Sequence, residues 1–336
     1  MSPRRIGVLG LGSIGMRHAR NLARLGCDVL GHDPSVDASR AFESEFGRAA
    51  TASREQVFAE SSAVVVATPN RFHLDDIRDA IVAGKPALVE KPLGHDAELA
   101  AHLVRLAAAR GVMLAVSHNL RFRPVVRQVR KLLDEGVIGK PAWARFCCAS
   151  WLPDWRPGRD YRTNYAADPE TGGVIFDSIH ELDLAVHLLG SAALRSAAAQ
   201  RTGLLDIASE DLADIVLDHE SGCQTAVHLD YVTRPRRRVL EIGDPGGALF
   251  ADLRTGNVKV TGIDGTVRAD ETQPFDPNGE YLAAMQDFLD ASNGAGKPEC
   301  PAADALETLR LACAARGMAG LPQSNSSKAS RQGVSH

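Results

Sequence analysis

Short apolar runs alternate with segments of helical period along roughly the first third of the chain. The runs occupy residues 5–10, 27–31, 63–67, 87–89 and 112–116. Continuous apolar runs of this length are typical of strands buried on both faces of a parallel sheet. The segments between them stop at glycines such as Gly26, Gly84 and Gly111, which indicates helices. The pattern predicts an α/β domain with a doubly wound parallel sheet.

A different pattern follows the glycine at position 190. Alternating apolar and polar residues predict strands at 211–219, 224–232, 237–242, 248–253 and 258–263, separated by turn dipeptides. We expect these strands to form an antiparallel meander. Helical spacing predicts one continuous helix at 173–189 before them and two more helices, around 280–291 and 303–318, after them.

The composition excludes several classes of protein. The 336 residues suffice for about two domains, and 44% hydrophobic with 24% charged residues excludes a wholly disordered or collagen-like chain. A net charge of −4 provides no positive field for nucleic acid or an anionic membrane. The six cysteines contain no Cys-x-x-Cys pair, so we expect no metal site and a reducing, cytoplasmic setting.

A glycine-rich turn follows the first apolar run. Gly10, Gly12 and Gly15 have the G-x-G-x-x-G spacing, and Asp33 stands eighteen residues beyond Gly15, where the second run ends. Gly10 permits a tight turn, Gly12 lets the backbone approach a pyrophosphate, and Gly15 lets a helix pack closely on a strand. A carboxylate at Asp33 accepts ribose hydroxyls and repels a 2′-phosphate, so the pattern favours NAD, with NADP as the alternative.

The amino terminus has a second interpretation. Arg4 and Arg5 precede a short apolar stretch, as in a twin-arginine export signal. Three glycines interrupt the stretch and no small-residue cleavage site follows. We therefore expect a strand that enters the glycine turn rather than a leader segment.

Polar residues stand where the later apolar runs end. Thr68 follows the third run, Lys91 the fourth and Asn119 the fifth. Because parallel strands bring their carboxyl ends to one edge of the sheet, where ligands bind, we expect these residues and Asp33 to face one site.

Five motifs occur in order along the chain, at residues 10–15, 67–73, 83–92, 119–124 and 172–183. Together they resemble the glucose-fructose oxidoreductase / inositol dehydrogenase / rhizopine catabolism (Gfo/Idh/MocA) family of nicotinamide-dependent oxidoreductases. The resemblance implies a Rossmann dinucleotide-binding domain at 1–120, then an α+β domain at 121–320 whose large, mainly antiparallel sheet serves substrate binding and oligomerisation. It also implies a sugar-like or cyclitol substrate and a homodimer or homotetramer. We expect the polar residues 321–336 to be a disordered tail.

The strand ends and the resemblance together predict the residues that bind the cofactor. They are Gly10, Gly12, Ser13, Ile14, Gly15, Asp33, Thr68, Pro69, Asn70, His73, Glu90, Lys91 and Asn119.

Lys91 is the first predicted catalytic residue. The resemblance assigns the lysine of Glu90-Lys91-Pro92 to the nicotinamide and the reacting hydroxyl, and it implies a cis Lys91–Pro92 peptide bond. The chemistry independently favours a lysine, because a cation beside an alcohol oxygen stabilises the alkoxide that develops as hydride leaves. Without its flanking motifs, a lysine before a proline at a strand end is more often an ordinary surface residue.

His180 is the second predicted catalytic residue. It matches the family's general acid/base histidine, and Asp177 and Asp183 each lie three residues from it on the predicted helix, so either can orient the imidazole. The family's aspartate precedes this histidine by four positions, which leaves the partner open, although Asp177 is assigned to the catalytic set. A zinc site of the His-Glu-x-x-His type is excluded because Leu184 replaces the second histidine.

The segment 151–165 combines four aromatic residues with three arginines. Aromatic faces suit sugar C–H surfaces, and arginines suit hydroxyl, carboxylate or phosphate groups, although a packed surface loop or a subunit contact has the same composition. Within the family this combination favours an acidic or activated sugar. The predicted substrate contacts are Arg121, Trp155, Arg156, Tyr161, Tyr165, Asp177 and His180.

These observations predict an NAD(P)-dependent oxidoreductase. It transfers a hydride between nicotinamide and a secondary hydroxyl or carbonyl of a sugar, sugar acid or cyclitol, with Lys91 and His180 at the reacting oxygen. One alternative is a nicotinamide-binding regulator without catalytic activity, and the presence of both Lys91 and His180 counts against it. Another is a lyase or epimerase that recycles NAD.

Overall fold

The computed structural model describes residues 3–156 and 158–323. The chain forms two compact units: the first runs to Asn119 and includes Asn278–Leu306, and the second comprises Leu120–Pro277 and the chain from Glu307 on. The expectation of one continuous second domain at 121–320 therefore differs from the structure, because residues 278–306 belong to the first unit. Of the expected tail, residues 324–336 lie outside the described residues.

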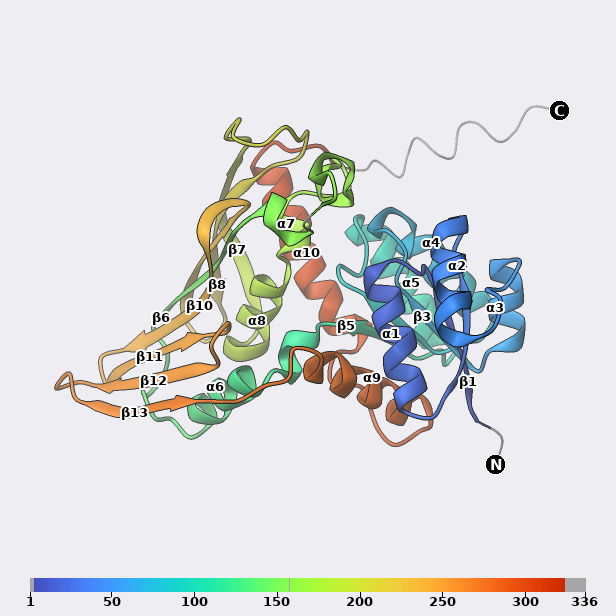
Figure 1. Cartoon of the computed structure of the whole chain (residues 1–336). Coiled ribbons are helices and arrows are strands. Elements are labelled where there is room, and N and C mark those ends of the chain that lie inside the picture. Colours follow the sequence, from blue (N-terminus) through green and yellow to red (C-terminus); the bar gives the residue numbers. More distant parts are fainter. Residues whose placement is uncertain (1–2, 157, 324–336) are drawn as a thin grey trace. The chain divides into compact units, whose positions relative to one another are not determined.

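The first unit contains a five-stranded sheet in which every neighbouring pair is parallel. The strand order is β2-β1-β3-β4-β5, and Figure 1 shows helices packed around these strands. The order reverses between β1 and β3, and ligands of such sheets bind at the carboxyl ends of the strands beside this reversal. The strands are β1 (Arg5–Leu9), β2 (Asp28–His32), β3 (Ala63–Val66), β4 (Ala87–Glu90) and β5 (Leu114–Ser117).

The helices of this unit follow the strands in the order that the sequence pattern predicts. Two helices that the pattern did not predict, α2 and α3, lie between β2 and β3 in the sequence. Asp96 caps α5, accepting hydrogen bonds from the backbone N–H groups of Glu98 and Leu99 at 3.0 Å. The helices are α1 (Ser13–Arg24), α2 (Val36–Phe46), α3 (Arg54–Glu60), α4 (Asn70–Val82), α5 (Ala97–Ala109) and α9 (Gly279–Ser292).

Helix α9 belongs to the first unit because its apolar face completes that unit's core. Met285, Phe288 and Leu289 are buried in one cluster with Leu22 of α1 and Val65 of β3. This burial accounts for the return of the chain to the first unit, since apolar area removed from water is the main stabilising contribution.

The second unit is built on an eight-stranded sheet with the order β13-β12-β11-β10-β6-β9-β8-β7. The neighbours are antiparallel except β6 and β9, which are parallel. Helices α6 (Pro124–Asp134), α7 (Val174–Asp177) and α8 (His180–Leu189) pack against it, and α10 (Ala302–Met318) ends in this unit. The strands are β6 (Trp143–Trp151), β7 (Ala192–Gln200), β8 (Leu212–His219), β9 (Gln224–Asp230), β10 (Val232–Asp244), β11 (Gly247–Asp252), β12 (Asn257–Gly262) and β13 (Val267–Thr272).

The predicted meander is wrong at its centre, because β6 lies between β9 and β10. Strands β9 and β10 are consecutive in sequence: β9 ends at Asp230, and β10 begins at Val232. Each nevertheless pairs with β6. The sequence pattern did not identify β6, β7 or β13, and Trp151, expected in a loop, ends β6. Among the described residues after Trp151, short 3₁₀ helices run at Leu152–Trp155, Tyr161–Thr163 and Tyr165–Ala167, the last of which extends past the predicted loop.

The single helix expected at 173–189 is two helices, α7 and α8, separated by Ser178 and Ile179. Tertiary contacts hold the two pieces separately. The N–H groups of Val174 and Ile175 donate to the backbone and side chain of Glu210, whereas α8 is held by its own buried ion pairs. Local helical spacing therefore identified the segment and not the break within it.

Candidate functional site

The three glycines of the turn after β1 face different surroundings. Gly10 has a φ of +84°, and a Cβ there would lie 2.6 Å from the carbonyl oxygen of Ala67. A Cβ on Gly15 would lie 1.8 Å from the carbonyl oxygen of Gly10, whereas one on Gly12 would meet nothing within 4 Å. Gly10 and Gly15 are thus required by the fold itself, and Gly12 leaves open space beside the turn.

Helices α1 and α4 begin without a side-chain cap. Gly12 and Pro69 stand at their N-cap positions, and neither first turn contains an acidic residue. By contrast, Ser35, Ser53 and Asp96 cap α2, α3 and α5 through their side chains. The first N–H groups of a helix and its dipole attract anions. The α1 terminus, with the open surface of Gly12, therefore fits the pyrophosphate of a dinucleotide.

Asp33 connects the end of β2 to this turn. Its Oδ2 accepts a hydrogen bond from the N–H of Leu11 at 2.7 Å, and its Oδ1 accepts one from the N–H of Ser35 at 2.8 Å. The carboxylate is thus fixed beside the glycine turn, and each oxygen retains a further lone pair for a ligand hydroxyl.

His73, predicted to bind the cofactor, is buried between two backbone carbonyl oxygens. Its side chain is 1% exposed, with Nδ1 2.8 Å from the carbonyl oxygen of Pro92 and Nε2 2.8 Å from that of Thr68. Burial lowers the pKa of His73, opposed by these two contacts and by the charges of Asp76 and Glu90. Both ring nitrogens lie at hydrogen-bond distance from backbone carbonyl oxygens, so the imidazole connects the end of β3 to the turn at Lys91. A contact between His73 and the cofactor stays a prediction.

Strand β4 ends at Glu90, and the Lys91–Pro92 peptide bond that follows is cis, which confirms that prediction. The Glu90 side chain is 11% exposed, and its Oε1 lies 2.7 Å from Nε2 of His18. Burial raises the pKa of Glu90, but the hydrogen bond to His18 and the charges of His18 and Lys91 outweigh it, so the pKa lies below its ordinary value. Glu90 is therefore an ionised, buried group next to Lys91.

Asn119 follows β5, and its side chain is also held by a hydrogen bond. Its Nδ2 donates to Oε1 of Glu280 at 2.7 Å, and both side chains are buried. Glu280 belongs to α9, so the returning helix contributes a polar residue to this edge of the sheet.

In the second unit, Asp177 lies between two tyrosines. Its Oδ1 accepts from the hydroxyl of Tyr165 at 2.6 Å, and its Oδ2 accepts from that of Tyr231 at 3.1 Å. The Trp155 and Tyr231 rings pack edge to face, with 5.4 Å between their centres. Burial, followed by the charge of Asp177, raises the pKa of Tyr231 well above its ordinary value. We call Trp155, Tyr165, Asp177 and Tyr231 the Asp177 cluster.

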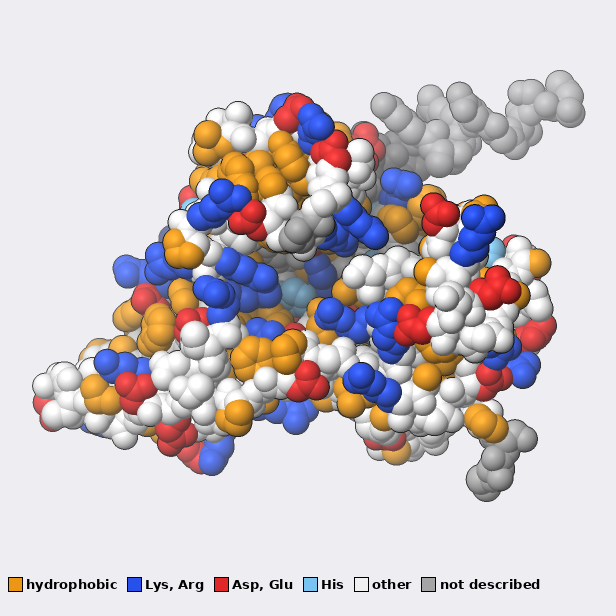
Figure 2. Space-filling model, in the orientation of Figure 1, with side chains coloured by type: hydrophobic (Ala, Val, Ile, Leu, Met, Phe, Trp, Pro, Cys, Tyr) orange, Lys and Arg blue, Asp and Glu red, His pale blue; other side chains and the backbone are white. Residues whose placement is uncertain are grey.

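Other predicted substrate residues lie around this cluster or apart from it. The Arg156 guanidinium is 6.0 Å from the centre of the Tyr165 ring. The Tyr161 hydroxyl accepts a hydrogen bond from the N–H of Asp206 at 3.3 Å. Figure 2 shows Lys and Arg side chains, in blue, gathered over the second unit. Arg162 of the segment 151–165 pairs with Asp160 at 2.8 Å, so its charge is already matched.

Arg121, predicted as a substrate contact, is part of a buried ion pair. Its Nε and Nη2 donate to the two carboxylate oxygens of Asp183 at 3.0 and 2.7 Å, with 4% and 0% of the side chains exposed. A buried arginine requires such a partner. His180 begins α8 and is 7% exposed, and which aspartate orients it stays a prediction.

Sequence reasoning missed four residues that hold these groups in place. His18 stands on the inner face of α1, and Tyr231 follows β9. Glu210 and Arg316 form a buried pair at 2.8 Å, and Arg316 also donates to the carbonyl oxygen of Gly172. Periodicity could have identified His18 as buried, but the partners of the other three lie 54 to 106 positions away.

Comparison with known proteins extends this description. Residues 4–118 match the model of an oxidoreductase family with an NAD-binding Rossmann fold, and residues 126–268 match the Gfo/Idh/MocA C-terminal domain. The chain belongs to the Gfo/Idh/MocA family. The resemblance carried by the five motifs is thereby confirmed, as are an oxidoreductase activity and NAD as the cofactor of this family.

Individual Gfo/Idh/MocA relatives cover most of the chain. It is 30% identical over 288 residues to 1,5-anhydro-D-fructose reductase of Ensifer adhaerens, covering 81% of this chain and 82% of that protein. It is 30% identical over 278 residues to inositol 2-dehydrogenase of Rhizobium meliloti, covering 79% and 80%.

A solved structure confirms the predicted fold class. An oxidoreductase from Agrobacterium radiobacter, in complex with NAD⁺, L-tartaric acid and magnesium, superposes with a TM-score of 0.82 at 24% identity, covering 94% of this chain and 96% of that one. Among the residues that the structure describes, no helix has both the length and the apolar character needed to cross a membrane.

Proposed function

We propose that this Gfo/Idh/MocA protein is an NAD-dependent dehydrogenase or reductase that acts on a secondary hydroxyl or carbonyl of a sugar, sugar acid or cyclitol. The observation that carries the proposal is the end of β4, where Lys91 follows the buried, ionised Glu90. In a parallel sheet this is the edge at which ligands bind.

The first unit supplies the groups that would hold the cofactor. The N–H groups at the start of α1 suit the pyrophosphate, and the Asp33 carboxylate suits the ribose hydroxyls and favours NAD over NADP. The open space at Gly12 supports this assignment. NAD, when bound, supplies the nicotinamide ring that accepts or donates the hydride.

We assign to Lys91 and His180 the charge stabilisation and the proton transfer at the alcohol oxygen. The Lys91 ammonium would stabilise negative charge on the oxygen as its proton leaves, and the His180 imidazole would take that proton as general base. In the reverse direction His180 would return the proton to the carbonyl oxygen. Asp177 is assigned a supporting role in the second unit, where Tyr165 and Tyr231 fix both of its oxygens.

The substrate class rests on the Asp177 cluster and on the relatives. The relatives are named for an anhydro sugar and for inositol, and the aromatic faces of Trp155 and Tyr165 suit the C–H surfaces of such molecules. Arg156, beside Tyr165, would favour a carboxylate or phosphate group on the substrate.

A substrate panel tests the proposal. The protein is incubated with NAD⁺ or NADH and with neutral sugars, sugar acids, nucleotide sugars, cyclitols and the matching keto compounds, and the absorbance of reduced nicotinamide is followed. We expect net reduction or oxidation with at least one member, strongest among the acidic or phosphorylated ones. Tight NAD binding with substrate conversion and no net absorbance change would replace the proposal by the recycling lyase or epimerase.

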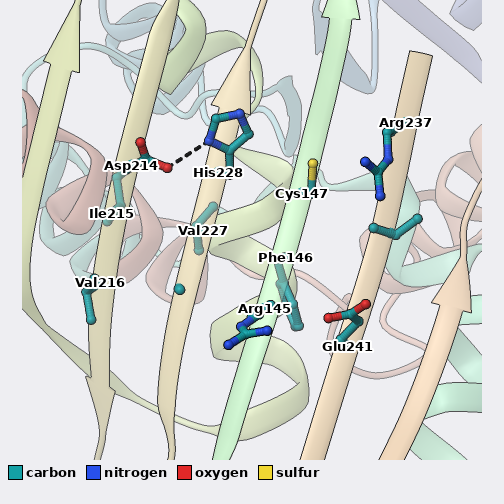
Figure 3. Close-up of a pocket in the computed structure, with 12 residues that line it drawn as sticks. Arg145, Phe146, Cys147, Asp214, Ile215, Val216, Val227, His228, Arg237 and Glu241 are labelled. Atoms are coloured by element: carbon teal, nitrogen blue, oxygen red, sulfur yellow. Dashed lines mark hydrogen bonds and ion pairs between the residues drawn. The ribbon is translucent and has the colours of Figure 1, made fainter. Parts of the chain in front are cut away.

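We further infer a homodimer or homotetramer, formed through the sheet of the second unit. Strands β6, β8, β9 and β10 line a cavity of about 290 Å³ on this sheet (Figure 3). It is lined by both signs of charge, including Arg145 and Glu241 on neighbouring strands. A surface with both signs can complement its own copy across a two-fold axis.

Light scattering tests this assembly. Ala226→Arg places a bulky cation in the cavity wall, and we expect it to give a monomer at concentrations where the parent chain is a dimer or tetramer. Ala295→Arg, at an exposed position of the first unit, is the matched control and should leave the mass unchanged. A monomeric parent chain, or an unchanged Ala226→Arg variant, would overturn the inference.

A further inference from the structure

The pair formed by His18 and Glu90 lies in the interior of the first unit. His18 projects from α1, three residues beyond Gly15, and its side chain is 0% exposed. Its Nε2 is 2.7 Å from Oε1 of Glu90 at the end of β4. The pair thus joins the helix that carries the glycine turn to the strand that precedes Lys91.

The position of His18 is fixed on its other side by α9. Its ring lies 6.3 Å from that of Tyr281 at an interplanar angle of 66°, and the Arg17 guanidinium is 4.4 Å from the centre of the Tyr281 ring. In the part of the chain that the structure describes, Nδ1 of His18 is buried without a hydrogen-bond partner. The polar contact of His18 is therefore directed to Glu90.

The carboxylate of Glu90 depends on this contact. A buried carboxylate is strongly disfavoured unless it is paired and hydrogen-bonded. Besides His18 and Lys91, the neighbouring Ser117 of β5 lowers the pKa of Glu90. Burial raises the pKa of Tyr281 of α9, and the charges of Glu90, Glu280 and Lys91 also act on this pKa. Without His18, Glu90 would lose its hydrogen bond from α1 and would take up a proton or turn away.

We propose that His18 is a positioning residue for Lys91, and that it acts by holding in place, in its charged form, the carboxylate of Glu90, the residue that directly precedes Lys91 at the end of β4. The importance of this role for catalysis rests on the proposed function of Lys91. Because His18 belongs to α1, the helix at the dinucleotide turn also sets the charge environment of the residue assigned to the reacting oxygen.

The first experiment measures the reactivity of Lys91 without using turnover. The full-length protein, with no added cofactor, is treated with limiting acetic anhydride at mildly alkaline pH, and acetylation of Lys91 is measured by mass spectrometry relative to the exposed Lys140. We expect His18→Leu and Glu90→Gln to label at Lys91 at least threefold faster, because an ammonium that has lost its carboxylate gives up its proton more readily.

Two matched variants separate positioning from general damage. His18→Gln keeps a side-chain N–H donor for Glu90 and should label close to the parent rate. Asn21→Leu removes another buried polar group from the same helix, one that bonds Asn278 and not Glu90, and should also label at the parent rate. Parent-like labelling in His18→Leu, or equally fast labelling in Asn21→Leu, would overturn the proposal. If His18→Leu does not fold, Glu90→Gln and His18→Gln decide it by the same comparison.

The second experiment uses turnover with a substrate found in the panel. We expect kcat of His18→Leu to fall at least tenfold while the Kd for NAD stays within threefold, and His18→Gln to recover most of kcat. Loss of NAD binding in proportion to kcat would make the role of His18 merely structural. If Lys91 proves dispensable for turnover, the proposed function fails, and the labelling result still decides whether His18 and Glu90 position it.

Discussion

The two units hold their functional side chains in different ways. In the first unit, backbone geometry positions most of the functional side chains. Gly10 and Gly15 shape the turn, and Asp33 and Lys91 directly follow the ends of β2 and β4. The groups involved are close to one another in sequence or repeat at strand ends. Such a site leaves motifs in the sequence.

In the second unit, side chains from distant segments hold the groups. Asp177 is fixed by Tyr231, 54 positions away, and Asp183 by Arg121, 62 positions away. Such a site leaves only single residues in the sequence, without a pattern that joins them. The comparison teaches that the first unit tolerates change where the backbone is open, whereas the second depends on its buried pairs.

The largest expected effect is at the buried pair of Arg316 and Glu210, which fixes Gly172 and the start of α7. Arg316→Leu leaves Glu210 buried without its cation, and we expect a loss of about 3–5 kcal/mol in the free energy of unfolding, measured in urea. Burial already raises the pKa of Glu210 despite Arg316.

Two variants control this prediction. Arg310→Leu changes an exposed arginine of the same helix and should shift stability by no more than about 0.5 kcal/mol. The double variant Arg316→Met/Glu210→Gln removes both charges and should recover most of the loss. A loss below about 1 kcal/mol in Arg316→Leu would show that the second unit does not depend on its buried pairs.

Two glycines of the same turn sharpen the comparison within the first unit. Gly15→Ala would place its Cβ 1.8 Å from a carbonyl oxygen, and we expect a loss of about 3 kcal/mol in stability. Gly12→Ala meets open space and an ordinary φ of −66°, so the melting temperature should stay unchanged while NAD binding weakens about tenfold, or 1.4 kcal/mol. Equal stability losses in both variants would refute the distinction.

In the Asp177 cluster, Tyr165→Phe removes the shorter of the two hydrogen bonds to Asp177. We expect kcat/KM for the sugar to fall about tenfold, which corresponds to about 1.4 kcal/mol, with the Kd for NAD unchanged. Thr163→Val, which removes a hydroxyl of the same segment that donates to the carbonyl oxygen of Asp160 instead, is the matched control. An equal loss of kcat/KM in both variants would contradict the assignment of Asp177 to the substrate site.

The smallest expected effect is the pH dependence of His228. Its hydrogen bond to Asp230, then its bond and charge interaction with Asp214, raise its pKa to about 9. A group with a raised folded pKa stabilises the protein fully below its unfolded value, about 6.5, and loses this contribution as pH rises through about 9.

Thermal melts of the parent chain and His228→Asn across this window check the prediction. The parent should be the more stable below about pH 6.5, and the difference should shrink by about pH 9. A difference that grows with pH would mean that the imidazole is not charged in the folded state.

Sequence patterns predicted the first unit well, because its strands and its glycine turn follow from local chemistry, whereas the cis bond after Lys91 was implied by the family resemblance. They failed where tertiary contacts decide. Strand β6 lies between β9 and β10, the helix after Gly173 breaks at Ser178, and the ion pair of Arg121 with Asp183 was not predicted. His18 was missed in the otherwise predictable unit for the same reason, since its partner is 72 positions away.

The central claim is that Lys91 acts at the reacting oxygen. Its most direct test is single-turnover hydride transfer by Lys91→Ala, with Lys140→Ala as an exposed control and the Kd for NAD measured in parallel. The account predicts a rate about a thousandfold lower in Lys91→Ala, with NAD affinity within a few fold of the parent value and Lys140→Ala unchanged. A near-normal rate in Lys91→Ala would contradict it.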